Sequence, residues 1–252
     1  MALKDSLISF WELEEASGTR VDAVTASGNN LTDNNTVTQN PGKVGQAAQF
    51  NRVNEEYLSR ASNASLQCGD IDFTVLGWIY MDDETDNNRI IAKDHTSPAG
   101  AREYLLTYRQ TSDRFEYFVF TPTDVAVQVV ANTFGAPTTA TWYFVVAWHN
   151  ASANTINIQV NDGGVDSTAT GGALQAAGGA EFRVGAAVYD GGGFGFHSGR
   201  LDQAGFWKRV LTPTERTWLY NSGNGRSYAE ILTWDAAAAE RLRLVTAGGR
   251  WV

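Results

Sequence analysis

The chain has 252 residues, of which 43% are hydrophobic, and its formal net charge is −9. This length and composition provide for a substantial core and exclude disorder over most of the chain. The acidic balance argues against binding to nucleic acid or to an anionic membrane, because both need a basic surface. The single cysteine, Cys68, excludes an intrachain disulfide and a zinc site made of thiolates.

The N-terminal stretch, residues 1–18, has no charged leader followed by an apolar run and a cleavage site. No other stretch reaches the roughly 18 continuous apolar residues of a membrane span. The sequence therefore predicts a chain that is made in the cytoplasm without a signal peptide.

Most of the sequence has the period-two pattern of β-strands. Runs 73–81 and 141–150 are apolar throughout and predict central strands covered on both faces, whereas 115–119 and 156–160 alternate. Turn clusters separate the runs, and the chain has 25 glycines but only 5 prolines. The pattern predicts an all-β sandwich rather than alternating βαβ units.

One helix is predicted after residue 211. Thr212 is suited to cap it, Pro213 to occupy its first position and Glu215 to complete a capping box. Gly223 offers a left-handed stop. We expect a short surface helix that closes the domain.

The C-terminal segment differs in composition from the rest. Residues 230–252 are rich in alanine and arginine, and we interpret them as a separate tail, helical in part, that serves anchoring or assembly. Residues 1–229 then form one domain. On this interpretation, truncation after Tyr228 leaves the sandwich folded and abolishes assembly or self-association into a homo-oligomer.

Several blocks, in this order, resemble the laminin-G-like branch of the concanavalin-A-type jelly rolls. They are residues 7–32, "GKVGQAAQFN" (42–51), "DFTVLGWIY" (72–80), the 141–150 run, the "IQVNDG" hairpin, "GRLDQAGFWKRVLTPTE" (199–215) and "LYNSGNGRSY" (219–228). The resemblance covers roughly residues 5–228. It implies a two-sheet antiparallel jelly roll used for carbohydrate or protein recognition, often stabilised by calcium, and it does not imply catalysis.

Catalytic patterns are not found. Glycanases on this fold carry an E-x-D-x-x-E strand, which the chain lacks, and no G-x-S-x-G elbow occurs. Glu12, Glu14 and Glu15 are close in sequence, but their setting favours a solvated turn over the paired carboxylates that glycoside hydrolysis needs. We expect no enzymatic activity.

A calcium site is the metal site that the sequence favours. Calcium prefers oxygen ligands, and Asp22 and Asn29 lie in an early loop while Asp202 lies in a late strand. In related jelly rolls the first and last strands pair, which would bring these residues together. The alternative is that Asp22 and Asn29 only make turn hydrogen bonds with the backbone.

The glycine-rich stretch "YDGGGFGFHSGR" (189–200) resembles a phosphate loop, but a strand follows it instead of the helix that such a loop requires. We predict ligand binding by its residues together with one from the 93–104 loop. The predicted residues are Tyr189, Phe194, Phe196, His197 and His95. The alternative is that the two phenylalanines fold back over the sheet edge.

Two functions follow from these observations. The first is a non-catalytic recognition module on a phage virion, as a capsid decoration or a fibre-like adhesin, because such a protein is made in the cytoplasm and later faces the exterior. The alternative is a free bacterial carbohydrate-binding lectin, extracellular and stabilised by calcium. The expected partner is a glycan or a protein of a cell surface or virion.

Overall fold

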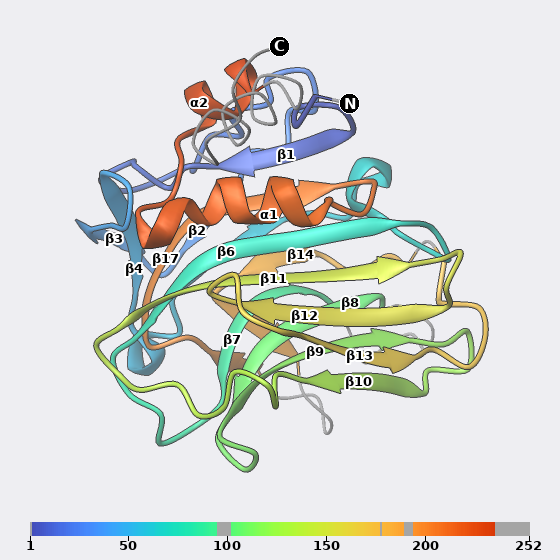
Figure 1. Ribbon diagram of the computed structural model, residues 1–252. Helices are drawn as coiled ribbons and strands as arrows, with labels where there is room; N and C mark the ends of the chain where they lie inside the picture. Colours follow the sequence, from blue (N-terminus) through green and yellow to red (C-terminus); the bar gives the residue numbers. More distant parts are fainter. Residues whose placement is uncertain (1, 95–101, 177, 189–193, 235–252) are drawn as a thin grey trace, which may run out of the picture.

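A computed structural model describes residues 2–94, 102–176, 178–188 and 194–234 of the chain. In this part the chain forms two large antiparallel sheets packed face to face (Figure 1). The first has eight strands: β13 (Val165–Ala169), β12 (Thr155–Val160), β11 (Trp142–Asn150), β6 (Phe73–Met81), β17 (Gly199–Trp207), β4 (Gln46–Phe50) and β3 (Thr38–Pro41) in that order, with β1 (Leu7–Trp11) also paired to β17.

The second sheet has seven strands in the described residues. Their order is β10 (Ala126–Val130), β9 (Arg114–Phe120), β8 (Tyr104–Arg109), β7 (Asn88–Lys93), β14 (Phe182–Val184), β5 (Tyr57–Arg60) and β2 (Thr32–Asn34). A separate hairpin consists of β15 (Ala186–Val188) and β16 (Phe194–Phe196). Short 3-10 turns are η1 (Arg52–Asn54), η2 (Ala64–Leu66) and η3 (Asn221–Gly223). The predicted all-β sandwich is confirmed.

The main core lies between the two sheets. In β9, Phe115, Tyr117 and Val119 belong to this core, while Glu116 and Phe118 lie on the other face of the strand. The period-two alternation in the sequence therefore corresponds to inward and outward faces, as the pleat of a strand requires.

The two apolar runs form central strands of the eight-stranded sheet. Val75 on β6 and Val145 on β11 face the main core, whereas Trp78 and Phe144 face outward into a second apolar cluster. Both faces of these strands are covered, and this explains why their sequences do not alternate.

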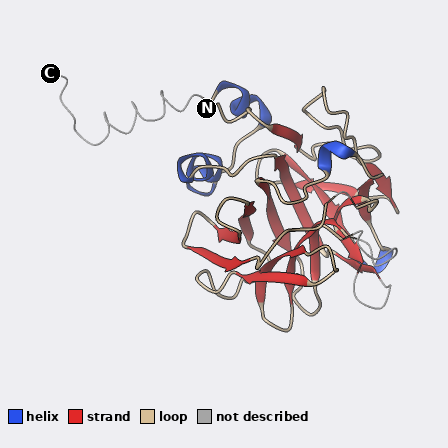
Figure 2. Ribbon diagram, turned by 90° about the vertical axis from the view of Figure 1, so that its right-hand side faces the viewer, coloured by secondary structure: helices blue, strands red, loops and turns tan. Residues whose placement is uncertain are grey.

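Two described α-helices contribute to the second cluster, α1 (Pro213–Tyr220) and α2 (Tyr228–Thr233). Figure 2 shows the helices outside the layered strands. The capping box of Thr212 and Glu215 forms as predicted, with Pro213 in the first turn. The left-handed residue that ends α1 is Asn221, two residues before the predicted Gly223.

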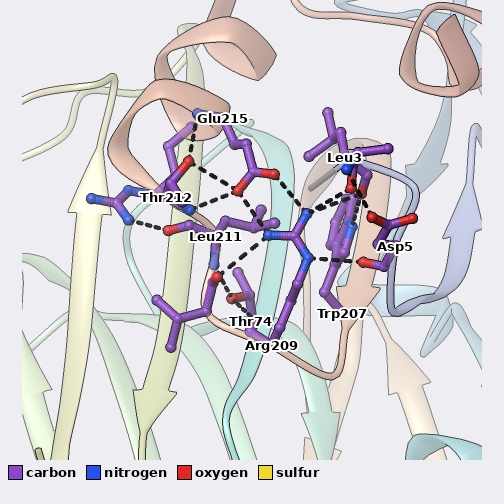
Figure 3. Close-up of polar contacts among 11 residues, drawn as sticks. Leu3, Asp5, Thr74, Trp207, Arg209, Leu211, Thr212 and Glu215 are labelled. Carbon is purple, nitrogen blue, oxygen red and sulfur yellow. Dashed lines mark hydrogen bonds and ion pairs between the residues drawn. The ribbon is translucent and has the colours of Figure 1, made fainter. Parts of the chain in front are cut away.

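A buried ion pair fastens α1 to the N-terminal segment (Figure 3). The Arg209 guanidinium donates to both carboxylate oxygens of Glu215 at 2.7 Å and also to the carbonyl oxygens of Leu3 and Asp5. The Glu215 carboxylate also accepts from the Thr212 backbone N–H. One guanidinium therefore joins the first residues of the chain, the end of β17 and the start of α1.

Helix α2 crosses the predicted domain boundary, because the boundary between residues 229 and 230 falls inside the helix. Ser227 and Glu230 form a second capping box at its start. Ile231 is fully buried and Trp234 is 7% exposed, both in the cluster on the outer face of the eight-stranded sheet. Residues 230–234 thus belong to the packed domain, and the remainder of the predicted tail lies outside the described residues. None of the described helices has the length and apolarity needed to span a membrane.

Candidate binding site on the seven-stranded sheet

The outer face of the seven-stranded sheet contains a cavity of about 650 Å³. It is lined by Asp86, Asn87, Arg89, Arg102, Leu105, Arg109, Phe118, Phe120, Ala126, Gln128, Val188 and Gly195. The volume lies within the range of small-molecule sites in proteins. This cavity is the candidate functional site.

The floor of the cavity is set by the register of the strands. Gln128 on β10 pairs with Phe118 on β9, which pairs with Leu105 on β8, which in turn pairs with Ala92 on β7. Because directly paired residues share a face, these four side chains form one row across the sheet. The row supplies an apolar platform with an amide at one end.

A second row carries charge. Arg89, Thr107 and Glu116 are paired across β7, β8 and β9. Arg89 Nη1 donates to Thr107 Oγ1 at 3.3 Å, and Arg109 Nε lies 3.7 Å from a Glu116 carboxylate oxygen. Burial lowers the pKa of Arg89, since desolvation disfavours its charged form.

Two arginines lie over the aromatic rings of the cavity. The Arg102 guanidinium is 4.0 Å from the centre of the Phe120 ring, and that of Arg109 is 5.8 Å from the centre of the Phe118 ring. A guanidinium group is flat and can stack on an aromatic ring, and this contact holds Arg102 and Arg109 against the floor of the cavity. The cavity therefore combines aromatic surface with several fixed cations.

The β15–β16 hairpin forms one wall of the cavity through Val188 and Gly195. The backbone N–H of Val188 donates to Asp94, whose pKa burial raises to about 6. A Cβ built on Gly195 would lie 2.9 Å from Arg89 Nε. A glycine at this position therefore lets the hairpin approach the arginine closely.

Two of the predicted ligand residues lie in the interior instead of at a surface. His197 is fully buried, its Nε2 donates to the Tyr80 carbonyl oxygen at 3.2 Å, and burial lowers its pKa to about 4. Phe196 is 9% exposed, and its ring centre lies 6.1 Å from that of Tyr57. His197 has no exposed surface and Phe196 packs against Tyr57, and ligand contact by these two side chains stays a prediction.

The remaining predicted ligand residues are not placed. His95, Tyr189 and the side chain of Phe194 lie outside the described residues. Val188, which precedes the glycine stretch, and Gly195, which lies within it, do line the cavity.

The strands expected to unite the calcium residues do pair, since β1 lies against β17. The Asp22 carboxylate, however, accepts from the backbone N–H groups of Phe10, Val24 and Asn29 and from the Ser27 hydroxyl. These donors direct positive charge at the carboxylate, so that a cation would have to displace them. The contacts at Asp22 agree with the alternative of turn hydrogen bonds.

The other two predicted ligands are engaged elsewhere. Asn29 donates its side-chain amide to Ser9 and Ser65. Asp202 accepts from the backbone N–H groups of Lys43 and Val44, and burial raises its pKa to about 7. The described residues contain no group of three or more histidine, cysteine or acidic side chains arranged for a metal ion. Among the described residues, Asn29 Oδ1 and Asp202 Oδ1 have no hydrogen-bond partner, and calcium binding stays a prediction.

The early glutamates also accept backbone hydrogen bonds. Glu12 accepts from Tyr228, Glu15 from Val21 and Glu14 from Gln46, while the three glutamates line a shallow hollow of about 280 Å³. Each carboxylate thus stabilises a turn or a junction, as the turn interpretation expects.

Sequence reasoning missed the arginines of the cavity. Arg89, Arg102 and Arg109 are separated along the chain and meet only through the pairing of β7 with β8. One signal was present in "DRFEYFVFT", where Phe118 and Phe120 occupy positions of the strand that alternate with the core residues. Large apolar side chains on an outward face indicate a covered or ligand-binding surface.

The sequence matches the model of the Concanavalin A-like lectin/glucanases superfamily over residues 54–215, which is more than half of the chain. The chain therefore belongs to this superfamily, and the predicted laminin-G-like resemblance is confirmed. No curated protein matches the sequence significantly.

Solved structures with the same fold include binding domains of larger proteins. The binding domain of Paraclostridial Mosquitocidal Protein 1 superposes with a TM-score of 0.68 at 14% identity over 88% of this chain and 53% of that one. A domain of an extracellular arabinanase from Geobacillus stearothermophilus, in complex with arabinotriose, gives 0.61 at 15% identity over 88% of this chain and 98% of that one. The botulinum neurotoxin serotype D ligand-binding domain, in complex with N-acetylneuraminic acid, gives 0.62 at 12% over 86% and 51%.

Identities this low show a shared fold. The chain spans about half the length of the two toxin domains. The domain is thus a lectin-like sandwich similar to toxin binding domains.

Proposed function

We propose that the domain is a glycan-binding module and that it binds its ligand in the cavity on the outer face of the seven-stranded sheet. The observation that carries the proposal is the joint presence in one cavity of an aromatic floor, amide groups and guanidinium groups. Sugar rings present an apolar face, which stacks on aromatic side chains, and hydroxyl groups, which need hydrogen-bond partners.

The comparisons support this choice of ligand class. Two proteins that share the fold were solved in complex with arabinotriose and with N-acetylneuraminic acid. Because those identities are low, these complexes support only the choice of saccharides as the ligand class. The proposed position of the site rests on the cavity of this chain.

A substitution that fills the cavity tests the proposal. Ala126 is an exposed residue of β10 that lines the cavity, so Ala126→Trp should abolish binding on a glycan array without loss of folding. Val165→Trp is the matched control, because Val165 is 42% exposed on β13, a strand of the other sheet. Equal binding by both variants would place the glycan site elsewhere.

We propose that binding occurs without catalysis. Glycoside hydrolysis needs two carboxyl groups that flank the scissile bond, whereas among the described residues that line the cavity the acidic one is Asp86. A reducing-sugar assay on the glycans that the domain binds should remain at background. Release of reducing ends that Asp86→Asn abolishes would contradict this part of the proposal.

We propose a phage virion as the setting, with a free bacterial lectin as the alternative. The support is the combination of a fold typical of recognition outside cells with a chain that has one cysteine. Mass spectrometry of purified virions from the source should detect the chain in stoichiometric amounts. Its detection only in the soluble fraction would favour the free lectin.

A further inference from the structure

We infer that the glycan bound in the cavity carries a carboxylate group, which the guanidinium groups of Arg89 and Arg109 hold. This inference rests on the proposed function, because it names the class of saccharide that the same cavity accepts. It is argued from the charge, the hydrogen bonds and the shape of the cavity wall.

The cavity has a local excess of positive charge in an acidic protein. Among the described residues that line it, the charged ones are three arginines, Arg89, Arg102 and Arg109, and one acid, Asp86, whereas the chain as a whole has a net charge of −9. Glu116 lies beside Arg109, but the Arg109 side chain remains 38% exposed. A planar guanidinium that is open to a cavity is suited to a two-point hydrogen bond with a carboxylate.

Arg89 has an unmet hydrogen bond at the site. Its side chain is buried, with the residue only 7% exposed, and among the described residues its Nε has no hydrogen-bond partner. An unpaired buried donor lowers stability, and a charged donor more than a neutral one. Nε itself is covered, so a bound carboxylate would contact Arg89 where the residue lines the cavity, and it would compensate the charge of this buried cation.

The β15–β16 hairpin approaches Arg89 closely at Gly195. The position of a Cβ on Gly195 would be only 2.9 Å from Arg89 Nε and 3.2 Å from Arg89 Cγ. Any larger residue at position 195 would press on the arginine and shift it, so the glycine lets Arg89 keep its place in the cavity wall.

The rest of the cavity is suited to a sugar rather than to a small inorganic anion. Phe118 and Leu105 form an apolar floor, and Gln128 and Asn87 offer amide groups to hydroxyls. An inorganic anion would gain nothing from the apolar floor, whereas a sugar ring would lie against it. The combination indicates a sugar acid, such as a uronic acid residue within an oligosaccharide.

The test uses the complete chain and matched pairs of ligands. A glycan array carries oligosaccharides with sugar acids next to the methyl esters of the same oligosaccharides, which keep the rings but lose the charge. We expect binding to the acids, affinity weaker by about tenfold to a hundredfold for the esters, as for loss of a charge-assisted bond, and weaker binding as salt is added.

Two variants test whether the difference in affinity between acids and esters arises in the cavity. Arg109→Gln and Gly195→Ala should each weaken acid binding, with thermal unfolding as the check on folding. Arg200→Gln is the matched control: it removes the same charge from β17 in the other sheet and should bind as the parent does.

The outcomes separate the inference from the proposed function. Equal affinity for acids and esters, with binding still abolished by Ala126→Trp, would overturn the inference and leave glycan binding in place. Binding to neither acids nor esters, nor to any neutral glycan, would overturn both.

Discussion

The outer faces of the two sheets differ in how they are covered. On the eight-stranded sheet, α1, α2 and the N-terminal segment enclose an apolar cluster that includes Trp78, Trp148 and Trp207. On the seven-stranded sheet the corresponding cluster has only five members in the described residues, Ala92, Leu105, Phe118, Phe120 and Ala187, and a cavity with three arginines lies over it.

This difference separates a stabilising face from a binding face. Burial of large apolar side chains under the helices adds to the free energy of unfolding. The open face gains less from burial, and it leaves guanidinium and aromatic groups within reach of a ligand. Substitutions on the covered face should therefore change stability, and those on the open face should change binding.

The largest expected effect is on truncation within the C-terminal segment. A chain that ends after Tyr228 loses buried Ile231 and Trp234, which should lower the free energy of unfolding by about 5 kcal/mol or more. A chain that ends after Trp234 keeps both and should unfold like the complete protein in urea. Equal stability of the two truncated chains would restore the boundary predicted at residue 229.

The buried ion pair of the covered face should rank next. Arg209→Ala leaves Glu215 buried without its partner, and a loss of about 3 to 5 kcal/mol is expected. Arg226→Ala is the control, because its pair with Glu230 has the same 2.7 Å separation but is partly exposed. Urea unfolding should show a loss of about 1 kcal/mol or less for the control. Similar losses for both arginines would contradict the role assigned to Arg209.

A matched pair of leucines compares the two faces directly. Leu219 of α1 is 3% exposed and Leu105 of β8 is 5% exposed. Leu219→Ala opens an enclosed space between helix and sheet and should cost about 3 kcal/mol, whereas Leu105→Ala only enlarges an existing cavity and should cost about half as much. Calorimetry that ranks the two in the reverse order would show that the open face is packed as tightly as the covered one.

The sequence predicts the covered face better than the open one. Apolar runs such as 73–81 and the Thr212–Glu215 capping box are local patterns, and both formed as expected. The cavity depends on the register in which β7 to β10 pair and on the approach of the distant β15–β16 hairpin, which periodicity cannot specify. The glycine stretch indicated an exposed loop, but its last residues enter the core, where His197 lies beside Phe50.

The predicted calcium site gives a second reason why the sequence predicts some parts of the molecule better than others. Asp22 has the right oxygen atoms for calcium, but whether an oxygen is free depends on which N–H groups the folded backbone directs at it. That competition is decided by tertiary structure. Thermal unfolding in calcium and in chelator should give the same midpoint, and a higher midpoint in calcium would restore the predicted site.

A pH dependence of stability is expected from one buried carboxyl on each face. Asp202 pairs in register with Trp78 on the covered side, and Asp94 contacts the hairpin at the open side. Burial raises the pKa of Asp202 to about 7 and that of Asp94 to about 6, against an ordinary value of 3.8. Between the ordinary and the raised pKa the folded state binds more protons than the unfolded state, so stability falls as pH rises.

Substitution by asparagine should remove these contributions separately. Asp202→Asn should reduce the fall in the free energy of unfolding between about pH 4 and 7, and Asp94→Asn should reduce the fall between about pH 4 and 6. Each slope should change by at most about 1.4 kcal/mol per pH unit. Urea unfolding at several pH values measures both slopes. Because Asp94 lies near Arg89, Arg102 and Arg183, a bound sugar acid should compete with its carboxylate for these cations and raise its pKa further. An unchanged profile for Asp94 in the presence of a bound acid would separate this carboxyl from the binding face.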